Sequence, residues 1–222
     1  MSAVIARGSA TRKANMEERR ARILDAAREL ISEDGFAGFN LRQLASVAEV
    51  TVPTIYNLIG NKDELVASLF DASLSPFENM QYIADDGDLI ASFESFFERV
   101  VEMLAAKPNY YRAEFRYKEH IKAMGDPIAR EIEARIESIA IEASRQARQA
   151  GVLLGNIDSA LLGRQLDRCF RVAYQDWATG AISLSAFKHQ AIVSTCICYA
   201  ADATPEMRER IVTRLQQLEA AQ

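Results

Sequence analysis

The sequence has few residues of the kinds that form disulfides, bind metals or break helices. Its 222 residues include three cysteines, five prolines, ten glycines and two histidines. An odd number of cysteines without framework spacing argues against a disulfide-linked secreted domain. The two histidines stand alone, with no cysteines or carboxylates at ligand spacing, so no metal site is expected. No nucleophile–base pair or phosphate-binding glycine loop is visible, which makes an enzyme the least favoured class, and no cofactor is expected.

Long apolar runs and alternating strand patterns are also missing. The longest nearly uncharged stretch late in the chain, residues 190–201, is too short to span a bilayer. The first basic residues are followed by more charge rather than by an apolar segment, so no secretory signal is expected. Because no run of alternating β-branched residues predicts a sheet, the expected fold class is all-α. The protein is expected in the cytoplasm, without membrane contact.

The three cysteines are Cys169, Cys196 and Cys198. Cys196 and Cys198 would point to different sides of a helix, so their spacing does not suit a metal. We favour buried small hydrophobic residues over redox sensors as their role.

Charge is unevenly distributed along the chain. The 31 acidic residues exceed the 26 basic ones, and a net charge of −5 argues against a protein that coats DNA non-specifically. Residues 1–70 hold nine of each sign, so the whole acidic excess lies after them. Seven Arg or Lys residues lie within residues 1–28, as expected of a basic arm that contacts a phosphate backbone. A solvated, frayed terminus would carry the same charge, and we predict residues 1–15 to be a disordered basic arm.

Residues 40–65, NLRQLASVAEVTVPTIYNLIGNKDEL, contain three short helix signals separated by tight turns. Asn40 and Gln43 have the spacing of a capping box at the start of the first helix. Asn61 and Glu64 have the same spacing at the start of the third, which should run from Lys62 to about Ser75. A longer helix, over residues 16–34, precedes the stretch.

The second helix of this stretch begins near Pro53. Thr51 can cap it through its hydroxyl, with Pro53 in the first turn, where a missing N–H costs little. Val52 is an alternative cap, because proline restricts the residue before it to extended conformations. Gly60 can end the helix in a left-handed turn.

Two helices joined by a three-residue turn have the geometry of a helix-turn-helix, whose second helix enters the DNA major groove. The second helix carries hydroxyl, amide and small apolar side chains that can meet phosphates and base edges. Those expected on its exposed face are Thr51, Val52, Pro53, Thr54, Tyr56 and Asn57. Short capped helices also occur in helical proteins of other functions, so the spacing alone leaves DNA binding open.

A family resemblance favours DNA binding. The residues that carry it are Ile23-Leu24-Asp25-Ala26-Ala27, Leu30, Gly35-Phe36, Asn40-Leu41-Arg42-Gln43-Leu44-Ala45, Val50-Thr51, Thr54-Ile55-Tyr56 and Lys62-Asp63-Glu64-Leu65. In order and spacing they resemble the DNA-binding domain of the tetracycline-repressor (TetR) family of bacterial regulators. The chain departs from the family at Glu49, usually glycine, where a left-handed conformation is needed. It also has Ile59 in place of an aromatic residue and Asn40 in place of a Thr or Ser cap.

The resemblance implies two domains: a helix-turn-helix DNA-binding domain over residues 16–75, and a helical ligand-binding and dimerisation domain over residues 76–222. Within the first, we expect Asn40, Arg42, Tyr56 and Lys62 to contact phosphates. We expect Thr51, Val52, Thr54 and Asn57 to contact base edges, beside Pro53.

Beyond residue 75 the apolar periodicity predicts six helices. They cover residues 89–106, 109–124, 128–150, 158–179, 183–201 and 204–220. The resemblance implies a homodimer formed through about residues 158–179 and 184–201. An apolar pattern on more than one face of the second of these segments agrees with burial by a partner.

Aromatic residues gather in the same region and are the candidate effector site. They could line an apolar cavity with a few polar groups, although aromatic residues at helical spacing also form ordinary core. The candidates are Phe93, Phe96, Phe97, Met103, Tyr110, Tyr111, Phe115, His120, Phe170 and Tyr174. The function implied is a repressor that a small, largely apolar effector releases from a palindromic operator. An activator, or a regulator without an effector, would have the same sequence features.

Overall fold

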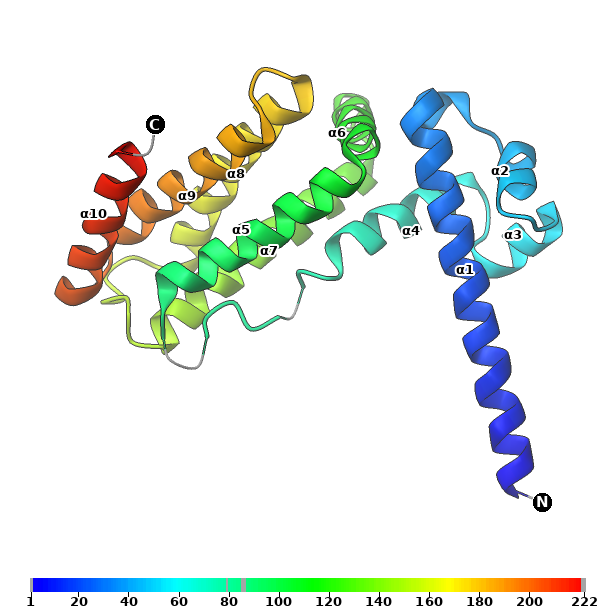
Figure 1. Cartoon of the computed structure of the whole chain (residues 1–222), viewed down its shortest axis with the longest axis horizontal. Helices are drawn as coiled ribbons and strands as arrows, with labels where there is room; N and C mark the ends of the chain where they lie inside the picture. The colour runs from blue at the N-terminus through cyan, green and yellow to red at the C-terminus, as the bar shows by residue number, and fades with distance from the viewer. Residues whose placement is uncertain (1, 79, 85–86, 221–222) are drawn as a thin grey trace. The chain divides into compact units, whose positions relative to one another are not determined.

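The computed structural model describes residues 2–78, 80–84 and 87–220, with side chains from residue 14 onward. Every regular element in these ranges is an α-helix, so the predicted all-α class is confirmed (Figure 1). The chain divides into two compact units, Met1–Ser75 and Pro76–Gln222. None of the helices in the described ranges is long and apolar enough to cross a membrane.

Residues 2–75 of the first unit form four helices. They are α1 (Ser2–Gly38), α2 (Leu41–Val47), α3 (Val52–Leu58) and α4 (Lys62–Leu74). The prediction placed the first helix at residues 16–34 after a disordered arm, whereas α1 is helical from Ser2. Gly35, with φ 71° and ψ 176°, interrupts the helical geometry one residue after the predicted end. A backbone with positive φ favours glycine, because glycine has no Cβ atom, and this explains why the kink lies at Gly35.

An apolar stripe along α1 forms part of the core of the first unit. Ile23, Ala27 and Ile31 are fully buried and recur every four residues, so they lie on one face of the helix. α1 packs against α2, α3 and α4. The rings of Phe36 and Phe70 stack with their centroids 6.3 Å apart, which closes this core at the far end of α1.

The described part of the second unit contains six helices. They are α5 (Leu89–Ala106), α6 (Pro108–Ala123), α7 (Pro127–Gln149), α8 (Ser159–Thr179), α9 (Leu184–Ala200) and α10 (Pro205–Ala220). Each boundary lies within one residue of its prediction. The agreement follows from strong end signals, because side chains of Asp88, Asp126, Asp158 and Ser183 accept hydrogen bonds from the first free amides of their helices.

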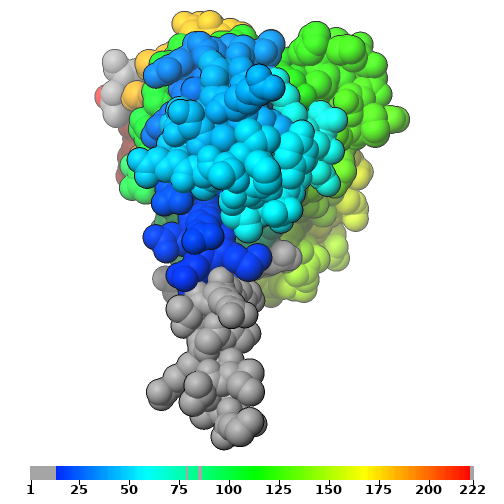
Figure 2. Space-filling view, turned by 90° about the vertical axis from the view of Figure 1, so that its right-hand side faces the viewer, coloured from blue at the N-terminus to red at the C-terminus, as the bar shows by residue number. Residues whose placement is uncertain are grey.

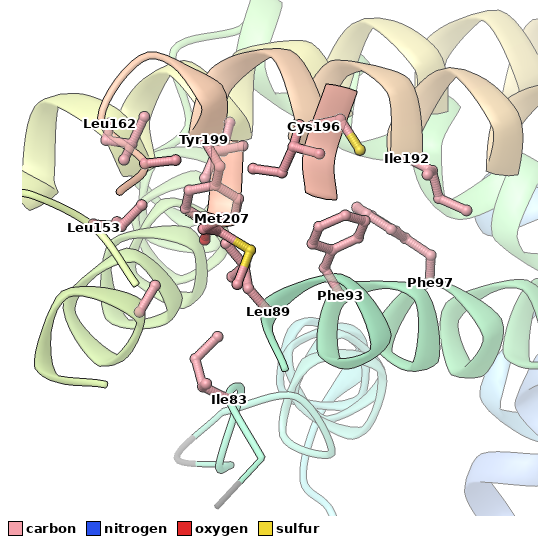
Figure 3. Packing of buried hydrophobic residues seen from close by; sticks show 14 of the residues in the cluster. Ile83, Leu89, Phe93, Phe97, Leu153, Leu162, Ile192, Cys196, Tyr199 and Met207 are labelled. Atoms are coloured by element: carbon pink, nitrogen blue, oxygen red, sulfur yellow. The ribbon is translucent and has the colours of Figure 1, made fainter. Parts of the chain in front are cut away.

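The core of the second unit lies where α5 meets α9. Figure 3 shows Phe93 and Phe97 of α5 on the side that faces Ile192 and Cys196 of α9. α8 packs extensively against both α7 and α9, and α10 packs against α9. Of the three cysteines predicted to be buried, Cys196 is fully buried in this cluster, whereas Cys169 and Cys198 are only half-buried.

A buried carboxylate joins two loops at one end of this unit. Asp202, 1% exposed, follows α9 and accepts hydrogen bonds from the backbone amides of Gly155, Asn156 and Ile157 at 3.0, 2.9 and 3.3 Å. An isolated antiparallel bridge pairs Leu153 with Ala203 beside it. Together these contacts attach the loop before α8 to the turn after α9.

Candidate functional site

Asn40 starts α2 through the predicted capping box. Its Oδ1 accepts hydrogen bonds from the amides of Arg42 and Gln43, both at 3.0 Å, and the side chain of Gln43 accepts from the Asn40 amide at 3.1 Å. The Nδ2 of Asn40 also donates to Gln43 at 2.6 Å. The cap therefore uses the Oδ1 of Asn40 and one of the two N–H groups of its Nδ2, whereas the Arg42 side chain is exposed to solvent.

The turn between α2 and α3 contains the left-handed residue expected from the sequence. Glu49 has φ 52°, and no other non-glycine residue of the described ranges has a positive φ. Its amide donates to the Ser46 carbonyl, and the amide of Val50 donates to the Ala45 carbonyl at 3.0 Å. The turn is thus held by backbone hydrogen bonds even though its side chain disfavours the conformation.

Thr51, and not the alternative Val52, caps α3. Its Oγ1 accepts from the amide of Thr54 at 3.3 Å, and the two threonine hydroxyls are 2.8 Å apart. Pro53 lies in the first turn, as predicted. The cap fixes where α3 begins, and so determines which of its side chains point outward.

The outward face of α3 carries Tyr56, with 55% of its surface exposed, and Asn57 beside it. Thr51 and Pro53 are also exposed, whereas Val52 and Thr54 are half-buried rather than exposed. Ile55 points inward and is fully buried. Figure 2 shows α2 and α3, in light blue to cyan, as neighbouring parts of one surface of the first unit.

Lys62, a predicted phosphate contact, makes internal contacts in the structure. Its Nζ donates a hydrogen bond to the backbone carbonyl of Phe39 at 3.1 Å and lies 4.7 Å from the centre of the Phe39 ring. It belongs to the first turn of α4, which Asn61 and Glu64 start through the second predicted capping box. Lys62 therefore ties the start of α4 to the residue before Asn40.

Two residues counted in the basic arm are also held within the first unit. Arg20 is half-buried and donates to the Leu58 carbonyl and to the Ser68 hydroxyl, both at 3.0 Å. Arg28 forms an ion pair with Asp25 at 2.9 Å. The sequence pattern offered no sign of these internal roles, because an arginine on a helix beside exposed arginines reads as a solvated charge.

Five of the candidate effector residues form a continuous series of aromatic contacts. Phe96 packs on Phe97, which stacks on Phe170 at 6.4 Å between ring centroids. Phe170 stacks on Tyr174, and Tyr174 meets Phe115 edge-on, both at 5.9 Å. These residues come from α5, α6 and α8, so the fold brings together side chains that are distant in the sequence.

The remaining candidates lie in different surroundings. Phe93 packs against Tyr199 in the core between α5 and α9, with ring centroids 6.5 Å apart. Met103 is half-buried on α5. His120 is exposed near the end of α6, and no aromatic contact joins it to the series within the described residues.

Tyrosine and carboxylate groups lie beside the aromatic series. Tyr110 and Tyr111 pack edge-on at 5.0 Å, and the Tyr110 hydroxyl donates to Glu114, which is buried, at 2.8 Å. Burial raises the pKa of Tyr174 well above its usual value, and the nearby charge of Glu114 adds to the effect. The Tyr174 hydroxyl therefore stays protonated and can only donate or accept hydrogen bonds.

Two aromatic residues that the prediction left out of the candidate set complete the series. Trp177 and Phe187 pack against Tyr174, with ring centroids 5.5 and 6.3 Å away. The guanidinium of Arg112 lies 5.4 Å from the centre of the Trp177 ring. The spacing of Tyr174 and Trp177, one helical turn apart, was the sequence signal for the first of them.

Comparisons with known proteins agree with this arrangement. Residues 23–69 match the family model of the bacterial regulatory proteins of the tetR family. A "DNA-binding transcriptional repressor TetR" from Mycobacteroides abscessus is 30% identical over 120 residues, a match that covers 52% of this chain and 60% of that protein. The match therefore spans less than two thirds of the relative's length.

Solved structures share the fold of both parts. The repressor SmeT of the Stenotrophomonas maltophilia multidrug efflux pump SmeDEF superposes with a TM-score of 0.67 at 19% identity, over 85% of this chain and 92% of SmeT. NalD, the secondary repressor of the MexAB-OprM multidrug efflux pump in Pseudomonas aeruginosa, gives 0.59 at 17% identity, over 85% and 99%. The capped helix pair and the left-handed turn between its helices lie within the segment that matches the tetR family model, and the helices of the second unit share the fold of these solved structures.

Proposed function

We propose that the protein is a sequence-specific DNA-binding transcriptional regulator, and that it represses by occupying a palindromic operator. The observation that carries this proposal is the outward face of α3, where Tyr56 and Asn57 are exposed on a helix fixed at its start by Thr51. A helix presented in this way after a tight turn fits the major groove, where amide and hydroxyl groups read base edges.

The contacts divide into two kinds. Arg42 and Tyr56 are exposed and are proposed to bind phosphates, together with Asn40 and Lys62 through donors that their internal hydrogen bonds leave available. Asn57 and the exposed Thr51, with the half-buried Val52 and Thr54 and the neighbouring Pro53, are proposed to face bases. Phosphate contacts set affinity and its salt dependence, whereas base contacts set the sequence preference.

The regulator is proposed to act as a homodimer through residues 158–179 and 184–201. α8 exposes Leu161 and Val172, 54% and 61% of whose surfaces are accessible, and α9 exposes Ile197 at 58%. Large apolar side chains exposed on neighbouring helices are typical of a surface that a partner covers. Two-fold symmetry would place two α3 helices about 34–36 Å apart, which matches successive major grooves of a palindrome.

A small, largely apolar effector is proposed to bind at the aromatic series of the second unit. Aromatic rings with a few polar groups, here the Tyr174 hydroxyl and the Glu114 carboxylate, are the composition of small-molecule sites. One similar structure is a complex of SmeT with triclosan, a ligand of that protein. An effector that prefers a conformation unsuited to DNA would release the operator by population shift.

DNA selection tests the proposal directly. The purified protein is incubated with a randomised pool of duplexes, and the enriched sequences are measured for affinity. Enrichment of a palindromic sequence is the expected result. No enrichment at low salt, where even weak complexes persist, would refute DNA reading.

Two substitutions then separate the kinds of contact. Arg42→Ala should weaken binding to all sequences and reduce the slope of log affinity against log salt by about one. Asn57→Ala should relax the sequence preference at one position while leaving the slope unchanged. A uniform loss of affinity in Asn57→Ala would show that this side chain does not read bases.

A further inference from the structure

The C-terminal end of α3 is held by a side chain from α1. The guanidinium of Arg20 donates from Nη1 to the backbone carbonyl of Leu58, the last residue of α3, at 3.0 Å. From Nη2 it donates to the hydroxyl of Ser68 on α4, also at 3.0 Å. One side chain thus joins three helices of the first unit.

The carbonyl that Arg20 binds has no partner within its own helix. The last four carbonyls of a helix lack the amides that would normally bind them. At the end of α3, the amides of Ile59 and Gly60 both donate to the carbonyl of Ile55, at 2.9 and 3.1 Å. The Leu58 carbonyl is left to Arg20, whose positive charge is also favourable at a helix C-terminus.

The position of α3 depends on few contacts, because the helix has only seven residues. Thr51 fixes its first turn, and Ile55 anchors its middle in the core. Arg20 fixes its last turn against α1 and α4. Tyr56 and Asn57 lie between the middle and the end, so a shift of the last turn changes the direction in which they point.

We propose that Arg20 is a positioning residue for DNA reading, which holds the end of α3 at the angle that presents Tyr56 and Asn57 to the major groove. The proposal rests on the proposed function for its effect on DNA. Its structural part concerns the first unit alone. An arginine suits the role because its planar fork can reach two acceptors at once, whereas a lysine has one nitrogen.

The test compares four variants with the wild-type protein. Arg20→Met removes both hydrogen bonds, Arg20→Lys keeps the charge without the fork, and Ser68→Ala removes one of the two acceptors. Arg19→Met is the matched control, since Arg19 is the exposed neighbour with the same charge on the same helix. Thermal unfolding establishes the temperature range in which each variant is folded, and the other measurements are made within it.

Two readouts are expected to change together. Hydrogen exchange at the amides of Ile59 and Gly60 should become about tenfold faster in Arg20→Met, because a hydrogen bond to a charged group is lost. Affinity for the duplex that the wild-type protein enriches, relative to a scrambled duplex of the same composition, should fall about tenfold. Arg20→Lys should change the exchange rates and the relative affinity in the same direction, and Ser68→Ala should change both by a smaller factor. The control should leave the exchange rates unchanged.

A third readout, the salt dependence of binding, distinguishes a positioning residue from a phosphate contact. Because Arg20 faces Leu58 and Ser68, its loss should leave the slope of log affinity against log salt unchanged. A slope lowered by about one, with unchanged exchange at Ile59 and Gly60, would make Arg20 a phosphate contact and overturn the proposal. Faster exchange without any loss of sequence discrimination would also overturn it.

The two proposals fail in different ways. If the wild-type protein enriches no duplex, the proposed function is refuted. Even then, faster exchange in Arg20→Met would support the conclusion that Arg20 fixes the last turn of α3. Equal exchange rates at Ile59 and Gly60 in Arg20→Met, Arg20→Lys and the wild-type protein would refute this role of Arg20, whatever DNA the protein binds.

Discussion

Gly163 of α8 lies directly against the backbone of Ile141 in α7: a Cβ atom at Gly163 would be 2.5 Å from the Cα atom of Ile141. Real Cβ atoms do not approach a backbone atom so closely, so glycine permits this crossing of two helices. We expect Gly163→Ala to destabilise the protein by about 1–3 kcal/mol through overpacking. Urea unfolding measures this as a lower free energy of unfolding.

The sign of that effect is informative, because glycine to alanine normally stabilises a helix by about 1 kcal/mol. Arg168→Ala, at an exposed position on α8, is the matched control and should change stability little. A Gly163→Ala variant as stable as the control would show that the helices move apart without cost.

Glu49→Gly should stabilise the first unit. The left-handed φ of 52° costs a residue with a side chain about 1–2 kcal/mol, and glycine avoids the strain. Glu49→Ala removes the charge but keeps the strain, so it should leave the melting temperature near that of the wild-type protein. If DNA binds as proposed, both variants should bind it more tightly, because both remove a negative charge beside α3. Equal melting temperatures for the two variants would contradict the strain argument.

A pH-dependent ion pair should contribute to the stability of the second unit. Two hydrogen bonds from Arg135 on α7, at 2.8 and 2.9 Å, lower the pKa of Glu78 below its usual 4.5. A carboxylate with a lowered folded pKa stabilises the protein above the unfolded pKa, and this contribution is lost as pH falls through the lower, folded value. Glu78→Gln should therefore cost about 1 kcal/mol at pH 7.

The difference between Glu78→Gln and the wild-type protein should shrink as the pH is lowered from 7 to 3, measured by chemical unfolding at each pH. Glu131→Gln, an exposed carboxylate on α7, is the control and should follow the wild-type curve. A constant difference across this range would mean that the pair contributes packing rather than charge.

Two of the three cysteines should be unreactive in the folded protein. Burial raises the pKa of Cys196 to about 11. Burial, with Cys169 next to it, raises that of Cys198 to about 12. At pH 8 a thiol of pKa about 11 is ionised in only about one molecule in a thousand, and the thiolate is the reactive form. In a Cys169→Ser background, a thiol reagent should label neither residue until urea is added, and rapid labelling without urea would contradict this.

Local signals in the sequence predicted the helix-turn-helix well. The side chains of Asn40, Thr51 and Asn61 bind amides only two or three residues away, so their roles follow from spacing alone. The left-handed turn at Glu49 followed from the family resemblance, since nothing in glutamate itself favours that conformation.

Contacts between helices could not be predicted in the same way. Arg20 and Lys62 read as free charges because their partners, the carbonyls of Leu58 and Phe39, lie 38 and 23 residues away. The aromatic series depends likewise on how α5, α6 and α8 cross. His120 shares its helix with Tyr111 and Phe115, yet it is exposed, because the helix turns that position away from the core.

The hydrogen bonds to the buried carboxylate of Asp202 have a consequence for how the second unit can move. At one end of the α8–α9 pair, the hydrogen bonds to Asp202 hold the loop before α8 to the turn after α9. At the other end, the short segment between Thr179 and Leu184 joins the same two helices. With both ends tethered, we expect α8 and α9 to tilt together rather than separately, so that the surface they expose changes little.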